Sequence, residues 1–206
     1  MPMESMTARE RVLCALDHEE ADRVPIDLGG FQTGIHRMAY AELVSYLGFN
    51  DQPAPVLDPI QQLVVPSEAV LERFHADVRY VTAHGPEGFD GAVRTNRRAG
   101  RLWHDLCDEF GVVWSMPDDE PLYMDITTHP LADATITDVE NYPFPHGADA
   151  SRFTGVRERA LALREWTPYA LSSGICGVTY ETCWYMRGLE RWFMDMVENP
   201  AFCEAL

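Results

Sequence analysis

Basic side chains are scarce in this sequence. Only 16 Lys and Arg residues stand against 33 Asp and Glu residues, which gives a formal net charge of −17 and an isoelectric point near 4.6. A protein that binds a phosphate backbone usually carries a stripe of basic side chains. No such stripe is present, so the sequence argues against nucleic acid as a partner. The acidic residues are spread among apolar positions, which indicates a solvated surface.

Long apolar runs and targeting signals are also absent. The chain does not open with a basic segment followed by an apolar run, as a secretory signal does. No apolar stretch approaches the roughly 20 residues that a membrane-spanning helix needs. We therefore expect a cytoplasmic protein with no membrane partner.

Paired cysteine motifs are missing as well. The cysteines are odd in number, widely spaced and form no CxxC pair: Cys14, Cys107, Cys176, Cys183 and Cys203. This pattern is typical of reduced thiols and not of a disulfide framework. No cysteines and histidines are spaced so as to complete a zinc site of three or four ligands, so we predict no metal ligand in this sequence.

The sequence does contain enough apolar residues for a sizeable core. Its 206 residues are 46% hydrophobic, and we expect a single domain over 1–206. A capping box of Thr7 and Glu10 predicts a helix over 7–18, within an N-terminal segment 1–23. The run at 24–28 carries one proline and ends in Gly29 and Gly30, which predicts a first strand.

Residues 24–86 are predicted to hold the first strands and helices of an α/β fold. Helical spacing from Ile35 to Leu47, with Gly48 as the residue that stops it, predicts a helix. Residues 50–59 carry three prolines and indicate a loop. Ser67 is placed to cap another helix that reaches Phe74, and the run at 78–82 predicts a second strand.

Residues 87–148 have a different composition. Four glycines among apolar and aromatic residues predict a β-hairpin insertion over 87–116. Five prolines between 117 and 145 exclude a long helix and predict a long surface connection. From 149 to 206 the helical pattern returns over 153–163, with Asp149 or Ser151 as its cap.

The rest of the chain is organised around residues 168–198. A short run at 169–173 predicts a buried strand, and a turn with Gly174 and Gly177 leads to a helix near Val178. The following helix has an apolar stripe that we expect to pack in the core: Leu189, Trp192, Phe193, Met196 and Val197. Asn199 and Pro200 then begin another helix. Since the sequence stops six residues later, we expect a domain truncated at its C-terminus.

Candidate binding residues cluster at the predicted strand ends. Sites in α/β proteins form just past the carboxyl ends of strands, and seven side chains fall there: Asp27, His36, His84, Ser173, Tyr180, Glu181 and Trp184. Taken singly, an aromatic residue or a histidine is more often structural than functional. We interpret the group as the wall of a substrate-binding pocket and name no catalytic residue, since Glu181 would act as an acid or base only if it were desolvated.

Several segments of the sequence, in this order, resemble the uroporphyrinogen decarboxylase superfamily. The similarity is greatest to its corrinoid-linked methyltransferase and O-demethylase branch. The segments that carry it are TARERVLCALDHEEADRVPIDLGG, LERFHADVRYV, DEFGVVW, HPLADATITDVENYPFP and YETCWYMRGLERWFMDMVENPAF. The resemblance implies a (β/α)₈ TIM barrel, which takes about 250 residues. The chain would then be the N-terminal part of such a barrel, with N-terminal helices and a β-hairpin insertion.

Three departures from the true decarboxylases bear on the reaction. The arginine-rich segment that grips the substrate carboxylates is replaced here by residues 26–30. His84 stands at the position that resembles the decarboxylase aspartate, and Trp184 at that of its tyrosine. These replacements favour transfer chemistry over porphyrinogen decarboxylation.

The methyltransferase branch implies a cobalamin-dependent enzyme that acts on a small methylated compound such as an aryl methyl ether. It also implies a zinc ion, which keeps a thiolate nucleophilic at neutral pH, and a partner protein that carries a methylcobamide. The zinc ligands of the family lie in the C-terminal half, so we expect neither cofactor to be bound by this chain alone.

Two alternatives stay open. The first is a tetrapyrrole enzyme similar to uroporphyrinogen decarboxylase itself. The second is a non-catalytic half-barrel that pairs with a copy of itself or with another chain, because half a barrel leaves strand edges open.

Overall fold

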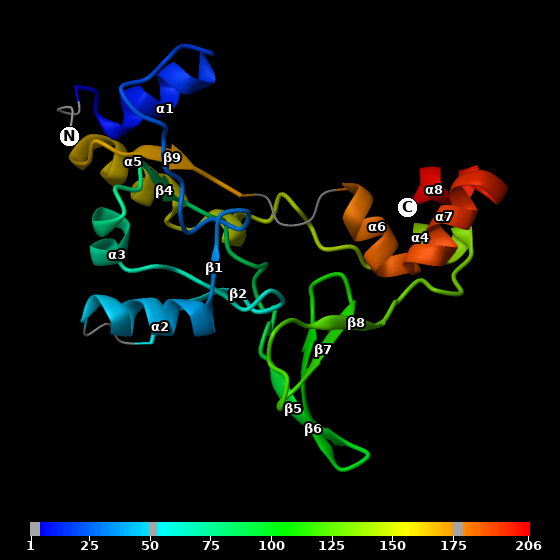
Figure 1. The fold of residues 1–206 in the computed structure, drawn as a ribbon. Coiled ribbons are helices and arrows are strands. Elements are labelled where there is room, and N and C mark those ends of the chain that lie inside the picture. Colours follow the sequence, from blue (N-terminus) through cyan, green and yellow to red (C-terminus); the bar gives the residue numbers. More distant parts are fainter. Residues whose placement is uncertain (1–4, 50–52, 175–178) are drawn as a thin grey trace. The chain divides into compact units, whose positions relative to one another are not determined.

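The computed structural model describes residues 5–49, 53–174 and 179–206, which form two compact units. The first unit comprises Met1–Ala83 and Phe153–Gly174, and the second comprises His84–Arg152 and Ile175–Leu206. The fold is a mixed α/β arrangement of short sheets and helices (Figure 1). Within the described ranges the strands do not close into a barrel. No helix among these residues is long and apolar enough to cross a membrane.

The first unit contains four helices among its described residues: α1 (Ala8–Leu16), α2 (Arg37–Leu47), α3 (Glu68–Arg73) and α5 (Val156–Trp166). The sequence signals for three of them are confirmed. Thr7 and Glu10 form the capping box of α1, Gly48 ends α2 in the left-handed conformation, and the Ser67 side chain accepts from the backbone N–H of Val70 to cap α3.

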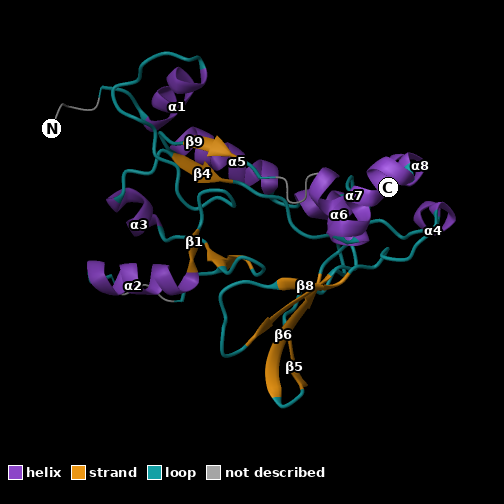
Figure 2. Ribbon diagram, turned by 45° about the vertical axis from the view of Figure 1, so that its right-hand side comes forward, coloured by secondary structure: helices purple, strands orange, loops and turns teal. Residues whose placement is uncertain are grey.

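Two small sheets complete this unit. One is antiparallel in the order β1 (Ile35–His36), β3 (Leu63–Val64), β2 (Val56–Asp58). The other pairs β4 (Val78–Tyr80) in parallel with β9 (Ala170–Ser172), and the two strands lie side by side in both ribbon views (Figures 1 and 2). The predicted strands at 78–82 and 169–173 are thereby confirmed.

A buried cluster in the first unit joins α2 to the β3–α3 region. Its members are Tyr40, Val44, Val64 and Val70. The Tyr40 hydroxyl accepts from the backbone N–H of Ser67 at 2.9 Å, so the one polar atom of this ring has a partner at the edge of the core.

The second unit is built on a four-stranded antiparallel sheet. Its order is β5 (Arg94–Arg98), β6 (Arg101–Cys107), β7 (Val113–Pro117), β8 (Asp125–Thr128), and the β5–β6 pair projects as a long hairpin (Figure 2). The helices of this unit among the described residues are α4 (Ile136–Glu140), α6 (Thr179–Arg187), α7 (Leu189–Glu198) and α8 (Pro200–Ala205). A 3₁₀ helix, η1 (Ala150–Phe153), leads from this unit into the first.

Four predictions about elements were wrong. Residues 24–28 form no strand and belong to no sheet. The hairpin expected in 87–116 is present as β5–β6, but the region 117–145 that was predicted as a plain connection contains the strand β8 and the helix α4. The expected loop at 50–59 contains β2, and α5 begins after Gly155, not after Asp149 or Ser151. Short elements of three to five residues are too brief to leave a clear period in the sequence.

The apolar stripe of α7 also departs from the prediction that it packs in the core. Trp192 is buried, but Leu189, Phe193 and Met196 are about half exposed, and Val197 is 82% exposed. The helix instead buries Asp195, because this carboxylate pairs with the Arg187 guanidinium at 2.7 Å. Periodicity therefore identified the helix but not the face that it buries.

Candidate functional site

The strongest candidate site lies at the carboxyl ends of β4 and β9. Tyr80 and Ser172 are the last residues of these strands and are partners in the parallel register. Parallel strands end at the same edge of a sheet, where backbone groups are free of the ladder and side chains converge. The site is thus placed by the strand pairing itself.

A buried ion cluster at the amino end of β4 fixes the neighbouring segment 24–28. Asp77 is 1% exposed; it accepts from Arg11 at 2.6 Å and from Arg23 at 2.7 and 2.9 Å. Asp77 also accepts from the backbone N–H of Ile26 at 2.8 Å, while its own N–H donates to the Ile26 carbonyl at 2.7 Å. These bonds hold residue 26 beside β4, so that Asp27 follows next to the strand.

Asp27 and Tyr80 form the centre of the site. The Tyr80 hydroxyl donates to Oδ2 of Asp27 at 2.6 Å, a short and charge-assisted hydrogen bond. Burial of the ring raises the pKa of Tyr80 above its usual value, and the hydrogen bond to Asp27 raises that pKa further. The phenol therefore keeps its proton at neutral pH. Asp27 itself is exposed to solvent.

The backbone at Gly30 passes directly against the Tyr80 ring. A Cβ atom at Gly30 would lie 2.2 Å from Cζ of Tyr80, so no side chain fits at this position. The Gly30 N–H donates to the hydroxyl of Thr33 at 3.1 Å, which closes the turn. The missing Cβ of Gly30 is therefore what lets the backbone approach the Tyr80 ring this closely.

The loop that follows β9 contacts the turn formed by residues 30–33. A Cβ at Gly174 would lie 2.9 Å from the ring of Phe31, so this ring packs on the glycine backbone. Ser173 precedes Gly174 and is exposed. Two loops and the end of β4, which are far apart in the sequence, therefore contribute polar and aromatic groups to one edge of the sheet.

The predicted site residues are divided between the two units. The first unit holds Asp27, Ser173 and His36. His36 caps α2, because its Nδ1 accepts from the backbone N–H of Met38 at 3.3 Å. This hydrogen bond gives His36 a structural role as the N-cap of α2, and that role requires no ligand.

The second unit holds the other predicted residues. His84 is exposed, and its backbone N–H donates to the Arg152 carbonyl at 2.8 Å. Tyr180 and Trp184 make edge contacts within the unit, with ring centroids 6.3 Å from Trp192 and 4.2 Å from Tyr185 respectively. Glu181 is exposed on α6, and Cys176 lies outside the described residues.

Sequence reasoning missed Tyr80, Thr33 and Phe31. Tyr80 lies within the predicted strand at 78–82, whereas the predicted site residue of this segment is His84, in the loop beyond the strand. The sequence offers one signal for Tyr80, which is its position near the carboxyl end of the predicted strand, two residues before Thr82. Phe31 directly follows the two glycines, and nothing in the sequence shows that its ring meets Gly174.

Comparisons with known proteins give no family for this chain. No family model, no curated protein and no solved structure matches it.

The described residues do not group into a metal site. Among residues 5–49, 53–174 and 179–206, no three His, Cys, Asp or Glu side chains lie together so as to hold a metal ion. The donor set that a zinc ion requires is therefore not formed by this part of the chain.

Proposed function

We propose that this chain is part of a (β/α)₈ enzyme of the uroporphyrinogen decarboxylase superfamily, in its corrinoid-linked methyltransferase branch, and that it acts in the cytoplasm on a small methylated compound. One observation carries the proposal: the parallel pair β4–β9 gathers Asp27, Tyr80 and Ser172 at its carboxyl ends. A barrel enzyme binds its substrate at that end of its strands.

In this proposal Asp27 and Tyr80 hold the polar part of the substrate. The Tyr80 hydroxyl orients the Asp27 carboxylate through Oδ2. The Oδ1 atom of Asp27 accepts no hydrogen bond from the described residues and can accept one from a substrate hydroxyl. Phe31 lies in the same group of loops and offers an aromatic surface for a ring. A methoxyphenol combines both features.

The resemblance implies a zinc ion and a methylcobamide for the reaction of the whole enzyme. A bound zinc ion would activate a thiol or polarise the reacting group. The described residues do not form a site for it, so the role proposed for this chain is to bind and orient the substrate. A corrinoid-carrying protein is the partner that the proposal requires.

The open edge of β9 supports a second candidate, a half-barrel completed by another chain. In the described part of the molecule β9 pairs only with β4, which leaves its other edge without a strand partner. Light scattering tests this candidate. A dimer that dissociates only on unfolding supports it, and a folded monomer contradicts it.

The test of the main proposal compares two ligands by NMR titration of the ¹⁵N-labelled chain. We expect 2-methoxyphenol to shift the amide signals of Gly30, Thr33 and Gly174. We expect uroporphyrin, a tetrapyrrole, to leave them unchanged. Shifts with uroporphyrin alone would favour the decarboxylase alternative, and no response to either ligand would contradict the proposed site.

A further inference from the structure

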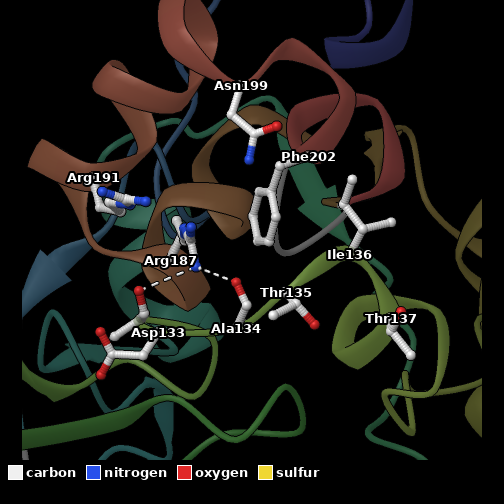
Figure 3. Close-up of a pocket in the computed structure, with 10 residues that line it drawn as sticks. Asp133, Ala134, Thr135, Ile136, Thr137, Arg187, Arg191, Asn199 and Phe202 are labelled. Atoms are coloured by element: carbon white, nitrogen blue, oxygen red, sulfur yellow. Dashed lines mark hydrogen bonds between the residues drawn. The ribbon is translucent and has the colours of Figure 1, made fainter.

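A cavity in the second unit lies apart from the site described above. Its volume is about 650 Å³, and it lies between the segment that leads into α4, the end of α6, and the helices α7 and α8. Figure 3 shows the residues that line it, among them Arg187, Arg191, Asn199 and Phe202. All of these residues belong to one unit, so the cavity is defined without reference to the other.

Arg187 lines this cavity, and its guanidinium group is fixed by several hydrogen bonds. The residue is 2% exposed; its Nε donates to Asp195 at 2.7 Å, and its Nη1 donates to the carbonyls of Leu131, Ala132 and Ala134 at 2.7 to 3.1 Å. Its guanidinium lies 3.9 Å from the centre of the Phe202 ring. No described residue accepts from Nη2, so that nitrogen is left for a ligand of the cavity.

The charges around Arg187 do not cancel. Arg191 lines the same cavity and is 52% exposed, and its Nε lies 3.6 Å from Oδ1 of the Asp195 that already pairs with Arg187. Two guanidinium groups thus share one buried carboxylate. The three residues Arg187, Arg191 and Asp195 carry one positive charge in excess, and the opposing charge of Asp133, which also lines the cavity, is exposed and screened by solvent.

Asn199 adds a polar group that the fold does not use. It stands at the position before α8 where an Asn side chain usually caps a helix, yet it makes no capping hydrogen bond. Its amide is instead turned into the cavity, toward the space that the Arg187 and Arg191 guanidinium groups border (Figure 3). Three nitrogen donor groups therefore border one volume: Arg187 from α6, Arg191 from α7, and Asn199 from the junction of α7 and α8.

We infer that this cavity binds an oxyanion, the carboxylate or phosphate group of a small molecule. A guanidinium group presents a planar fork of N–H donors that matches two oxygen atoms, and an amide N–H₂ supplies a further donor. Asp133 also lines the cavity, and its carboxylate would repel a bound anion. Because Asp133 is exposed, solvent weakens this repulsion. The inference does not depend on the proposed function, because it involves no residue of the β4–β9 site.

The first experiment titrates the intact chain separately with inorganic phosphate and with acetate, at constant ionic strength, and follows the NMR signals of Asn199 and Arg191. We expect saturable shifts with at least one anion. Arg191→Gln should weaken that binding about tenfold, the loss expected for one charge-assisted hydrogen bond. The matched control is Arg157→Gln, which removes an exposed charge in the other unit and should leave the affinity unchanged.

Two further variants test the sign of the interaction. Asn199→Asp keeps the shape of the side chain but places a second carboxylate in the cavity, so it should abolish anion binding. Asp133→Asn removes a repulsion and should tighten it about two- to threefold. A response to phosphate alone or to acetate alone identifies which group the site takes.

Several outcomes would overturn the inference. One is the absence of saturable shifts with both anions. Another is a loss in Arg157→Gln as large as that in Arg191→Gln, which would mean that only the net charge matters. A third is unchanged affinity in Asn199→Asp with the folded spectrum retained.

Discussion

Gly30 is the residue on which the geometry of the candidate site depends most closely. Its missing side chain lets the backbone lie on the Tyr80 ring, and the ring in turn directs its hydroxyl at Asp27. The close contact of Gly30 with the Tyr80 ring and the hydrogen bond from Tyr80 to Asp27 depend on each other. A single Cβ atom added at Gly30 would therefore disturb both.

Gly30→Ala is therefore expected to lower the free energy of unfolding by about 1–3 kcal/mol, since the new Cβ would lie 2.2 Å from the Tyr80 ring. Urea denaturation measures the change. Gly147→Ala is the matched control, because nothing lies within 4 Å of a Cβ built there. Equal stability of the two variants would contradict the described contact.

Asp22 links the pH dependence of stability to the ion cluster near β4. Its carboxylate accepts from Arg11 at 2.6 and 3.1 Å and from the N–H groups of Met6 and Ser5, and these bonds hold the pKa of Asp22 well below its usual value. A lowered pKa in the folded state means that the contribution is complete above the unfolded pKa of about 3.9 and is lost as the pH falls below it.

Asp22→Asn should consequently lose less stability than the wild type between pH 5 and pH 3. The asparagine cannot be protonated in this range, so one source of acid destabilisation is removed. Urea midpoints at pH 5, 4 and 3 measure the difference. A variant whose stability falls with pH as steeply as that of the wild type would show that Asp22 does not contribute.

At the scale of elements, α7 shows that a hydrophobic period can predict a helix without predicting which of its faces is buried. The five apolar positions mark a helix, yet Trp192 is buried while Val197 is 82% exposed. The buried face is decided by the ion pair of Arg187 with Asp195, two charged residues that lie eight positions apart. No hydrophobic pattern contains that information.

Trp192→Ala and Val197→Ser test this assignment directly. Removal of the buried indole should cost about 3–5 kcal/mol of unfolding free energy, as large-to-small core changes do. The exposed valine should tolerate serine within about 0.5 kcal/mol. Thermal or urea unfolding of the two variants gives both values, and a large loss in Val197→Ser would show that the apolar stripe is buried after all.

Much of the fold could be predicted because local chemistry determines it. The capping residues Thr7 and Ser67, the stop at Gly48 and the two strands that became β4 and β9 all follow from rules that act within a few residues. The four-stranded sheet of the second unit could be recognised only in part. Its strands pair with one another across the chain, but the individual segments show no strong alternation of apolar and polar residues that would predict the pairing.

The candidate site could be predicted at Asp27 and Ser173 but not at Tyr80. The first two lie at or next to the carboxyl ends of predicted strands, where sites are expected. The importance of Tyr80 depends on a hydrogen bond across 53 positions and on the contact with Gly30, which only a folded chain reveals.

At the scale of the whole molecule, charge limits the chemistry that this sequence can supply. All 16 basic residues are arginines and none is lysine, so a Schiff base with a lysine amine is excluded for this sequence. Arginine keeps its charge at any pH that the protein tolerates and favours paired, planar contacts. The basic side chains are therefore suited to hold structure and anions, and not to transfer protons.

The central claim is that Asp27 and Tyr80 bind a small ligand at the carboxyl ends of β4 and β9. The most direct test is the dissociation constant of 2-methoxyphenol for the wild type, Asp27→Asn, Tyr80→Phe and the control Tyr46→Phe, which alters an 88% exposed ring on α2. We predict that Asp27→Asn weakens binding about tenfold, that Tyr80→Phe weakens it about three- to tenfold, and that Tyr46→Phe changes nothing. Equal affinity in all four proteins would contradict the account.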